Sequence, residues 1–99
     1  MNYVQQIKET ITGAYEFTDK DKTVFKLKLL GRGEELFFQK DDRALVCDIS
    51  ARFAMIDPKT ITKWDNGQKI SDEERTEILV KIIELYKEAY KDSLQVFKQ

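Results

Sequence analysis

The side chains able to do acid–base or nucleophilic chemistry are few and poorly grouped. The chain of 99 residues contains no histidine, which removes the commonest proton shuttle and the commonest transition-metal ligand. Its single cysteine, Cys47, alternates with Leu45 and Ile49, so we expect the thiol to point into a core and not to act as a nucleophile. One cysteine also cannot form a thiolate zinc site. We therefore assign no catalytic residue, no metal site and no cofactor.

Adjacent carboxylates occur at three points of the chain, Glu34-Glu35, Asp41-Asp42 and Glu73-Glu74. Each pair coincides with an expected turn or helix start. Nothing in their spacing makes two carboxylates face each other across a cleft, as paired-acid hydrolysis requires. Gly31-Arg32-Gly33 lacks the third glycine and the Lys-Ser/Thr of a phosphate-binding loop, and it is typical of a hairpin turn. We expect no enzymatic activity.

Composition sets broad limits on the fold and on the partners. The chain is 41% hydrophobic and 35% charged, which predicts one globular domain over residues 1–99. Its 17 basic and 18 acidic residues nearly balance, so we expect no nucleic-acid binding based on phosphate attraction. No apolar run approaches the roughly 20 residues of a membrane span, and we expect no membrane partner. The single cysteine and the absence of an apolar signal core predict a cytoplasmic protein.

The clearest element is a helix from about Ser71 to Tyr90. Ser71-Asp72-Glu73-Glu74 has the pattern of a capping box, in which Ser71 accepts from the third helical amide and Glu74 reaches back. At 100° per residue its apolar side chains cover an arc of roughly 160°: Ile78, Leu79, Ile82, Ile83, Leu85, Tyr86, Ala89 and Tyr90. Such a wide arc means that the helix lies deep in a curved sheet or offers its margin to a partner. Residues 93–98 fit either a continuation of this helix or a short terminal strand.

The rest of the chain predicts antiparallel strands joined by short turns. Alternation of apolar and polar side chains is clearest from Thr23 to Leu30, where Phe25, Leu27 and Leu29 share one face. Residues 1–12 fit either a helix or a strand, and we favour a strand over about 10–18 after an irregular or short helical lead-in. Ser50 could cap a single helical turn over 51–54. Further strands are expected over 34–40, 44–49 and 59–64.

The predicted fold class is therefore α+β: an antiparallel β-meander of four to six strands, with one long C-terminal helix packed across a face. Trp64 ends the last expected strand, and its ring should pack on the first two turns of the helix, near Ile78 and Ile82. Asp65 should reach Arg75 in the first helical turn. Alternatively Trp64 belongs to a binding face, because Trp and Tyr dominate interface hot spots. The candidate structural or partner-binding residues are Trp64, Asp65, Arg75 and Tyr90.

The segment from Ile61 to Ile82 resembles the small bacterial immunity proteins of polymorphic toxin systems. The type in question has an Ile-x-x-Trp-Asp/Glu strand followed by a Ser/Thr-x-Glu-Glu-Arg-x-x-Ile helix. The matching positions here are Trp64, Ser71, Glu74, Arg75 and Ile78. The resemblance implies a short β-meander with a C-terminal helix. It also implies that the protein binds a cognate toxin domain and blocks it, without chemistry of its own.

Two other function classes remain open from the sequence. One is a homo-oligomeric interaction or regulatory module unrelated to toxins, with a homodimer formed through the margin of the C-terminal helix. The other is a small-molecule sensor that uses the crevice between sheet and helix. A toxin-domain reading frame directly upstream of the gene would favour the immunity protein, and an isolated gene would favour the interaction module.

Overall fold

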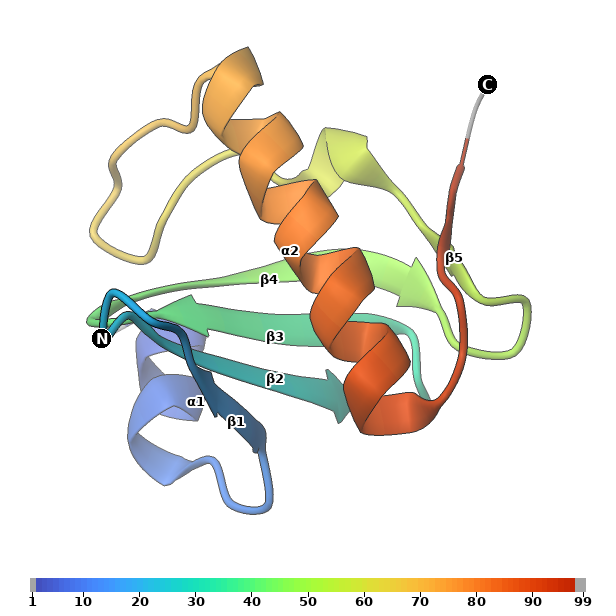
Figure 1. Ribbon diagram of the computed structural model, residues 1–99. Coiled ribbons are helices and arrows are strands. Elements are labelled where there is room, and N and C mark those ends of the chain that lie inside the picture. Colours follow the sequence, from blue (N-terminus) through green and yellow to red (C-terminus); the bar gives the residue numbers. More distant parts are fainter. Residues whose placement is uncertain (1, 98–99) are drawn as a thin grey trace.

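The computed structural model describes residues 2–97 and has the expected α+β fold. Over these residues a curled six-stranded sheet, in the order β1 to β6, wraps around one long C-terminal helix (Figure 1). Neighbouring strands are antiparallel except β5 and β6, which are parallel. The elements are α1 (Tyr3–Thr10), β1 (Tyr15–Thr18), β2 (Val24–Leu30), β3 (Glu35–Lys40), β4 (Arg43–Ser50), β5 (Met55–Ile56), a 3₁₀-helix (Pro58–Thr60), α2 (Asp72–Tyr90) and β6 (Gln95–Val96).

The central meander follows the alternation seen in the sequence. Leu27 pairs with Phe38, and Phe38 pairs with Leu45, so that buried side chains from β2, β3 and β4 form a row facing α2. Gly33, in the turn between β2 and β3, has a φ of +86°, and a Cβ there would lie 2.7 Å from that of Ala51. This turn therefore requires glycine.

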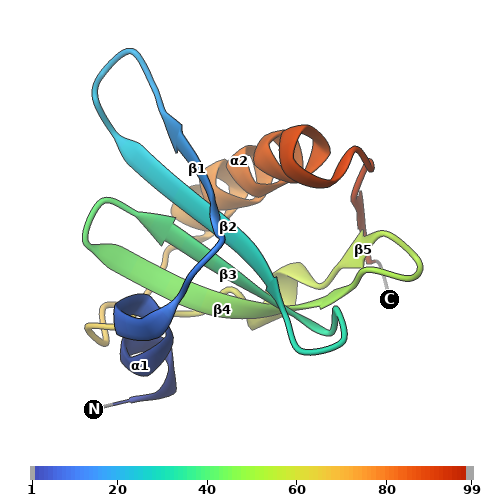
Figure 2. The ribbon, with the colours of Figure 1, turned by 90° about the horizontal axis from the view of Figure 1, so that it is seen from below.

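The N-terminal segment is a helix followed by a shorter strand than expected. Asn2 caps α1 by accepting from the amide of Gln5, and the strand that was expected over 10–18 covers only β1. Gly13, at a φ of +72°, separates the two elements. Helix α1 lies on the side of the sheet opposite α2, against β4 (Figure 2). Phe37, between Leu36 and Phe38 of the α2-facing core, is fully buried on that second side.

The strand expected over 59–64 is wrong. Pro58 fixes its own φ and starts a 3₁₀-helix, and the carboxylate of Asp57 caps it by accepting from the amide of Lys59. Residues 61–71 then form a loop with one isolated bridge, between Lys63 and Lys69. The strand that pairs with β4 is instead β5.

The helical turn expected over 51–54 is also not formed. These residues make a tight turn, and Ala54 has a left-handed φ of +53°, which cannot continue a helix. The turn reverses the chain directly after β4. This reversal allows Met55 and Ile56 to pair back onto Ser50 and Ile49 as β5.

Helix α2 starts where the sequence predicts. The Ser71 hydroxyl accepts from the amide of Glu74 at 3.1 Å. The predicted bond from Glu74 back to Ser71, the other half of a capping box, is wrong. The Glu74 carboxylate lies 3.7 Å from Arg43 instead. The helix ends at Lys91, which adopts a left-handed φ of 58°. The chain then forms β6, so the terminal strand is the correct alternative, and residue 98 of that expected segment lies outside the described residues.

Candidate functional site

Trp64 is a core residue. Its side chain is 1% exposed and shares the α2-facing core with Ile78 and Ile82. Its ring centroid lies 6.4 Å from that of Phe38, and the guanidinium carbon of Arg43 lies 4.5 Å from the ring. The indole Nε1 is buried and has no hydrogen-bond partner among residues 2–97. Trp64 is therefore part of the core.

Asp65 joins three separate parts of the chain. One carboxylate oxygen lies 2.6 Å from Lys8 Nζ on α1, and the other accepts from the amide of Ala44 on β4 at 3.0 Å. Its carbonyl oxygen accepts from the side chain of Asn2. Burial alone would raise the pKa of Asp65, but the bonds from Lys8 and from Ala44 outweigh burial and lower it. Asp65 thus ties α1 to β4 and to the loop after Trp64.

The expected contact between Asp65 and Arg75 is wrong. Arg75 donates from Nε to the carbonyl of Ile61 at 2.9 Å and from a terminal nitrogen to Asp72 at 2.8 Å. These bonds hold the start of the 61–71 loop against the first turn of α2. The difference arises because the sequence did not clearly show α1, whose Lys8 is the actual partner of Asp65.

Tyr90 lies at the opposite end of α2 from these residues. Fifteen positions separate it from Arg75, which corresponds to roughly 22 Å along the helix. Its ring is 37% exposed and packs on Tyr86 at 4.8 Å, and its hydroxyl accepts from the amide of Leu29. Trp64 and Asp65 therefore lie in the loop 61–71, and Arg75 bonds to the start of that loop. Tyr90 lies at the other end of α2.

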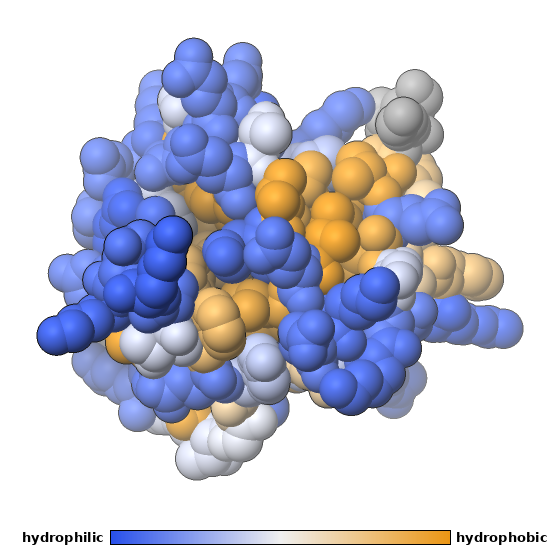
Figure 3. Space-filling model, in the orientation of Figure 1, coloured by the Kyte–Doolittle hydropathy of each residue, from blue (hydrophilic) through white to orange (hydrophobic). Residues whose placement is uncertain are grey.

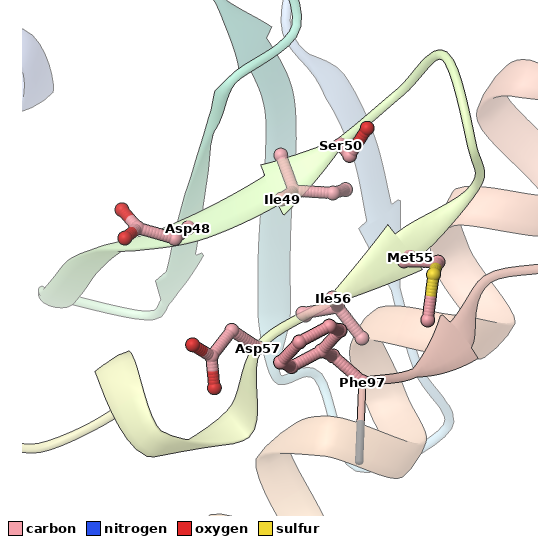
Figure 4. A pocket seen from close by; sticks show the side chains of 7 residues that line it. All are labelled: Asp48, Ile49, Ser50, Met55, Ile56, Asp57 and Phe97. Carbon is pink, nitrogen blue, oxygen red and sulfur yellow. The ribbon is translucent and has the colours of Figure 1, made fainter. Parts of the chain in front are cut away.

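An open and mostly apolar pocket lies elsewhere, where β4, β5 and the end of β6 meet. Figure 4 shows Phe97 beside Ile56, with the carboxylates of Asp48 and Asp57 at one end of the pocket. Its volume is about 210 Å³. The lining residues are Asp48, Ile49, Ser50, Met55, Ile56, Asp57 and Phe97.

Three short pairings position this pocket. Met55 and Ile56 pair antiparallel with Ser50 and Ile49. The amide of Asp57 donates to the carbonyl of Asp48 at 3.1 Å, and the amide of Phe97 donates to the carbonyl of Ile56 at 2.8 Å. Extending the pairing by one residue therefore places Asp48, Asp57 and Phe97 side by side across the three strands.

Apolar side chains are unusually exposed around the pocket. Phe97 is 45% exposed, and Phe53, in the turn between β4 and β5, is 68% exposed. The guanidinium carbon of Arg52 lies 5.4 Å from the Phe53 ring. Figure 3 shows hydrophobic residues gathered on the surface between α2 and β5. Exposed aromatic and arginine side chains beside an apolar pocket are typical of protein-binding surfaces.

The thiol of Cys47, on β4, belongs to the α2-facing core. Cys47 is buried, and burial is the main cause that raises its pKa to about 12. The negative charges of Asp48, Asp57 and Glu35 raise the pKa further in the same direction. The thiol is thus protonated at neutral pH.

The sequence did not single out the pocket residues, because two-residue strands carry no readable alternation. The only available signal was Phe53, an aromatic residue within a turn. Among residues 2–97, no three potential ligands are grouped to hold a metal ion, and no helix is long and apolar enough to cross a membrane. No protein-family model, curated protein or solved structure compared with this chain matches it.

Proposed function

We propose that this protein is a non-catalytic binding module that neutralises a bacterial toxin domain by direct contact. The observation that carries the proposal is the open apolar pocket between β4, β5 and Phe97, in which Phe97 itself is 45% exposed. An exposed apolar patch rimmed by polar groups is characteristic of a protein interaction site. The resemblance of residues 61–82 to immunity proteins supports the same function.

The chemistry of the surface favours binding over catalysis. The accessible apolar surface of the pocket comes mainly from Met55 and Phe97, since Ile49 and Ile56, which also line it, are 7% and 0% exposed. The thiol of Cys47 is held protonated. Apolar surface of this kind desolvates an inserted side chain, which is what a binding site requires. The contact surface on this proposal is the pocket region, and Trp64 stabilises the core elsewhere in the fold.

The proposal predicts that a toxin domain is encoded directly upstream of the gene. The test is the growth of bacteria that express this toxin domain, with and without the protein. The wild-type protein is expected to restore growth. Phe53→Ser removes an exposed aromatic in the turn that joins Ser50 and Met55 of the pocket lining, and it should weaken the rescue. Val80→Ser is the matched control, since Val80 is 52% exposed on α2, and it should rescue as the wild type does. Failure of the wild-type protein to restore growth would refute the proposal.

A second candidate function, a homodimeric interaction module, is favoured by the flank of α2. Leu79 and Ile83 lie one turn apart there and are only partly buried, and Val80 beside Leu79 is more exposed than either. A dimer formed through this flank would double the molar mass measured by light scattering. Val80→Asp would return that mass to 11.7 kDa. A monomeric wild-type protein at high concentration excludes this candidate.

A further inference from the structure

We propose that the pocket between β4, β5 and Phe97 receives a partner segment in which a basic side chain adjoins an apolar one. The apolar side chain fills the pocket, and the lysine or arginine beside it meets the carboxylates of Asp48 and Asp57. This inference names the partner chemistry of the surface proposed above. It rests on that proposal only where the partner is said to be a toxin domain.

The size of the pocket sets the first part of the partner chemistry. Its volume of about 210 Å³ is below the range of roughly 300–1,000 Å³ that is usual for drug-sized ligands. A single aliphatic or aromatic side chain suits it better than a cofactor or a metabolite. Met55 and Phe97, the apolar lining residues that are not buried in the core, offer such a side chain no hydrogen bond from their own side chains.

The charge at one end of the pocket sets the second part of the partner chemistry. Within residues 2–97, the carboxylate of Asp48 is exposed and has no hydrogen bond or ion pair, and that of Asp57 accepts only the amide of Lys59. The two residues occupy adjacent strands, so their negative charges add at one end of the pocket. Their field reaches inward as far as Cys47, whose pKa they raise. Among the described residues that line the pocket there is no lysine or arginine, so nothing in the lining itself offsets these two charges.

A positive group beside an apolar anchor complements both features at once. An isolated cation would leave the apolar walls unused, and an apolar anchor followed by an acidic residue would be repelled. Charge complementarity of this kind chiefly sets which partner is accepted, and the buried anchor supplies most of the affinity. The binding site thereby discriminates among apolar anchors by the charge of the residue next to them.

The test is a titration followed in ¹H–¹⁵N NMR spectra of the full chain, with three capped dipeptides as probes. Acetyl-Leu-Arg-amide should shift the amide signals of Ile49, Ser50, Asp57 and Phe97. Acetyl-Leu-Gln-amide, which lacks the charge, should bind the same residues roughly threefold to tenfold more weakly. Acetyl-Gly-Arg-amide, which lacks the anchor, should give no shift at the pocket.

The double variant Asp48→Asn/Asp57→Asn removes the charge without removing the cap of the 3₁₀-helix, since asparagine accepts from the amide of Lys59 as aspartate does. It should bind the arginine and glutamine probes equally. The control Glu9→Gln/Asp21→Asn removes two exposed carboxylates elsewhere and should preserve the wild-type preference.

Equal affinity of the wild-type protein for the arginine and glutamine probes, or shifts that map away from the pocket, would overturn the inference. The outcome does not depend on a toxin. Probe binding at the pocket together with failed growth rescue would reject the proposed function and keep the pocket chemistry. Growth rescue by a protein that shows no preference between the arginine and glutamine probes would keep the proposed function and reject the pocket chemistry.

Discussion

Replacing Trp64 by alanine should destabilise the fold more than any capping substitution. Trp64 is 1% exposed, and a buried tryptophan removes roughly 200 Å² from water, worth about 5 kcal/mol at about 25 cal/mol per Å². The contacts with Phe38 and Arg43 disappear as well. Partial collapse of the cavity lowers the cost to about 3–5 kcal/mol. Ser71→Ala removes one cap bond and should cost only about 1 kcal/mol.

Urea unfolding followed by circular dichroism measures both variants against the wild-type protein. Trp64→Phe is the informative third variant. This substitution also removes the buried indole N–H, which has no partner among residues 2–97, and that removal recovers about 1–3 kcal/mol of the free energy of unfolding. The stability of the Trp64→Phe variant should therefore lie within about 1 kcal/mol of the wild type. If Trp64→Ala unfolds at the same urea concentration as Ser71→Ala, or at a higher one, the packing of Trp64 does not stabilise the core.

Three further predictions concern the other buried groups. The pKa of Asp65 is lower in the folded state than its unfolded value near 4. The free energy of unfolding that Asp65 adds relative to Asp65→Asn should therefore be full above about pH 4 and should fall as the pH drops towards the folded pKa. Urea unfolding from pH 2 to 7 measures this difference. A constant difference across that range would contradict this. Lys8→Met leaves the carboxylate of Asp65 without its cation and should cost about 2 kcal/mol at pH 7, measured in the same way; a variant as stable as the wild type would mean that the ion pair does not hold α1. Cys47 should not react with Ellman's reagent at pH 8 until the protein is unfolded, and rapid labelling of the native protein would show that the thiol is accessible.

Local signals in the sequence were sufficient for the meander and the long helix. The alternation around Phe25 and Leu27 reports a half-buried strand directly, and the Ser71 cap marks the start of α2. Elements held by tertiary contacts were not predictable in this way. Strand β5 has two residues and exists because β4 and β6 flank it, and α1 is held to β4 in part by the bond between Lys8 and Asp65.

The site was harder to predict than the fold, for a related reason. Trp64, Asp65 and Arg75 attracted attention by their residue types, yet each is engaged by the chain itself in packing, an ion pair or a backbone bond. The exposed groups of the pocket come from separate positions such as Asp48 and Phe97, which only the pairing of β4, β5 and β6 brings together. No spacing along the sequence encodes that proximity.

Hydrogen–deuterium exchange, compared between the free protein and its complex with the toxin domain that the proposed function predicts, shows which surface makes the contact. Binding through the pocket predicts slower exchange at residues 48–57 and 95–97. The loop 61–71, which holds Trp64 and Asp65, should exchange as in the free protein. Protection of 61–71 with none at 48–57 would contradict the account and would make the Trp64 motif the contact surface.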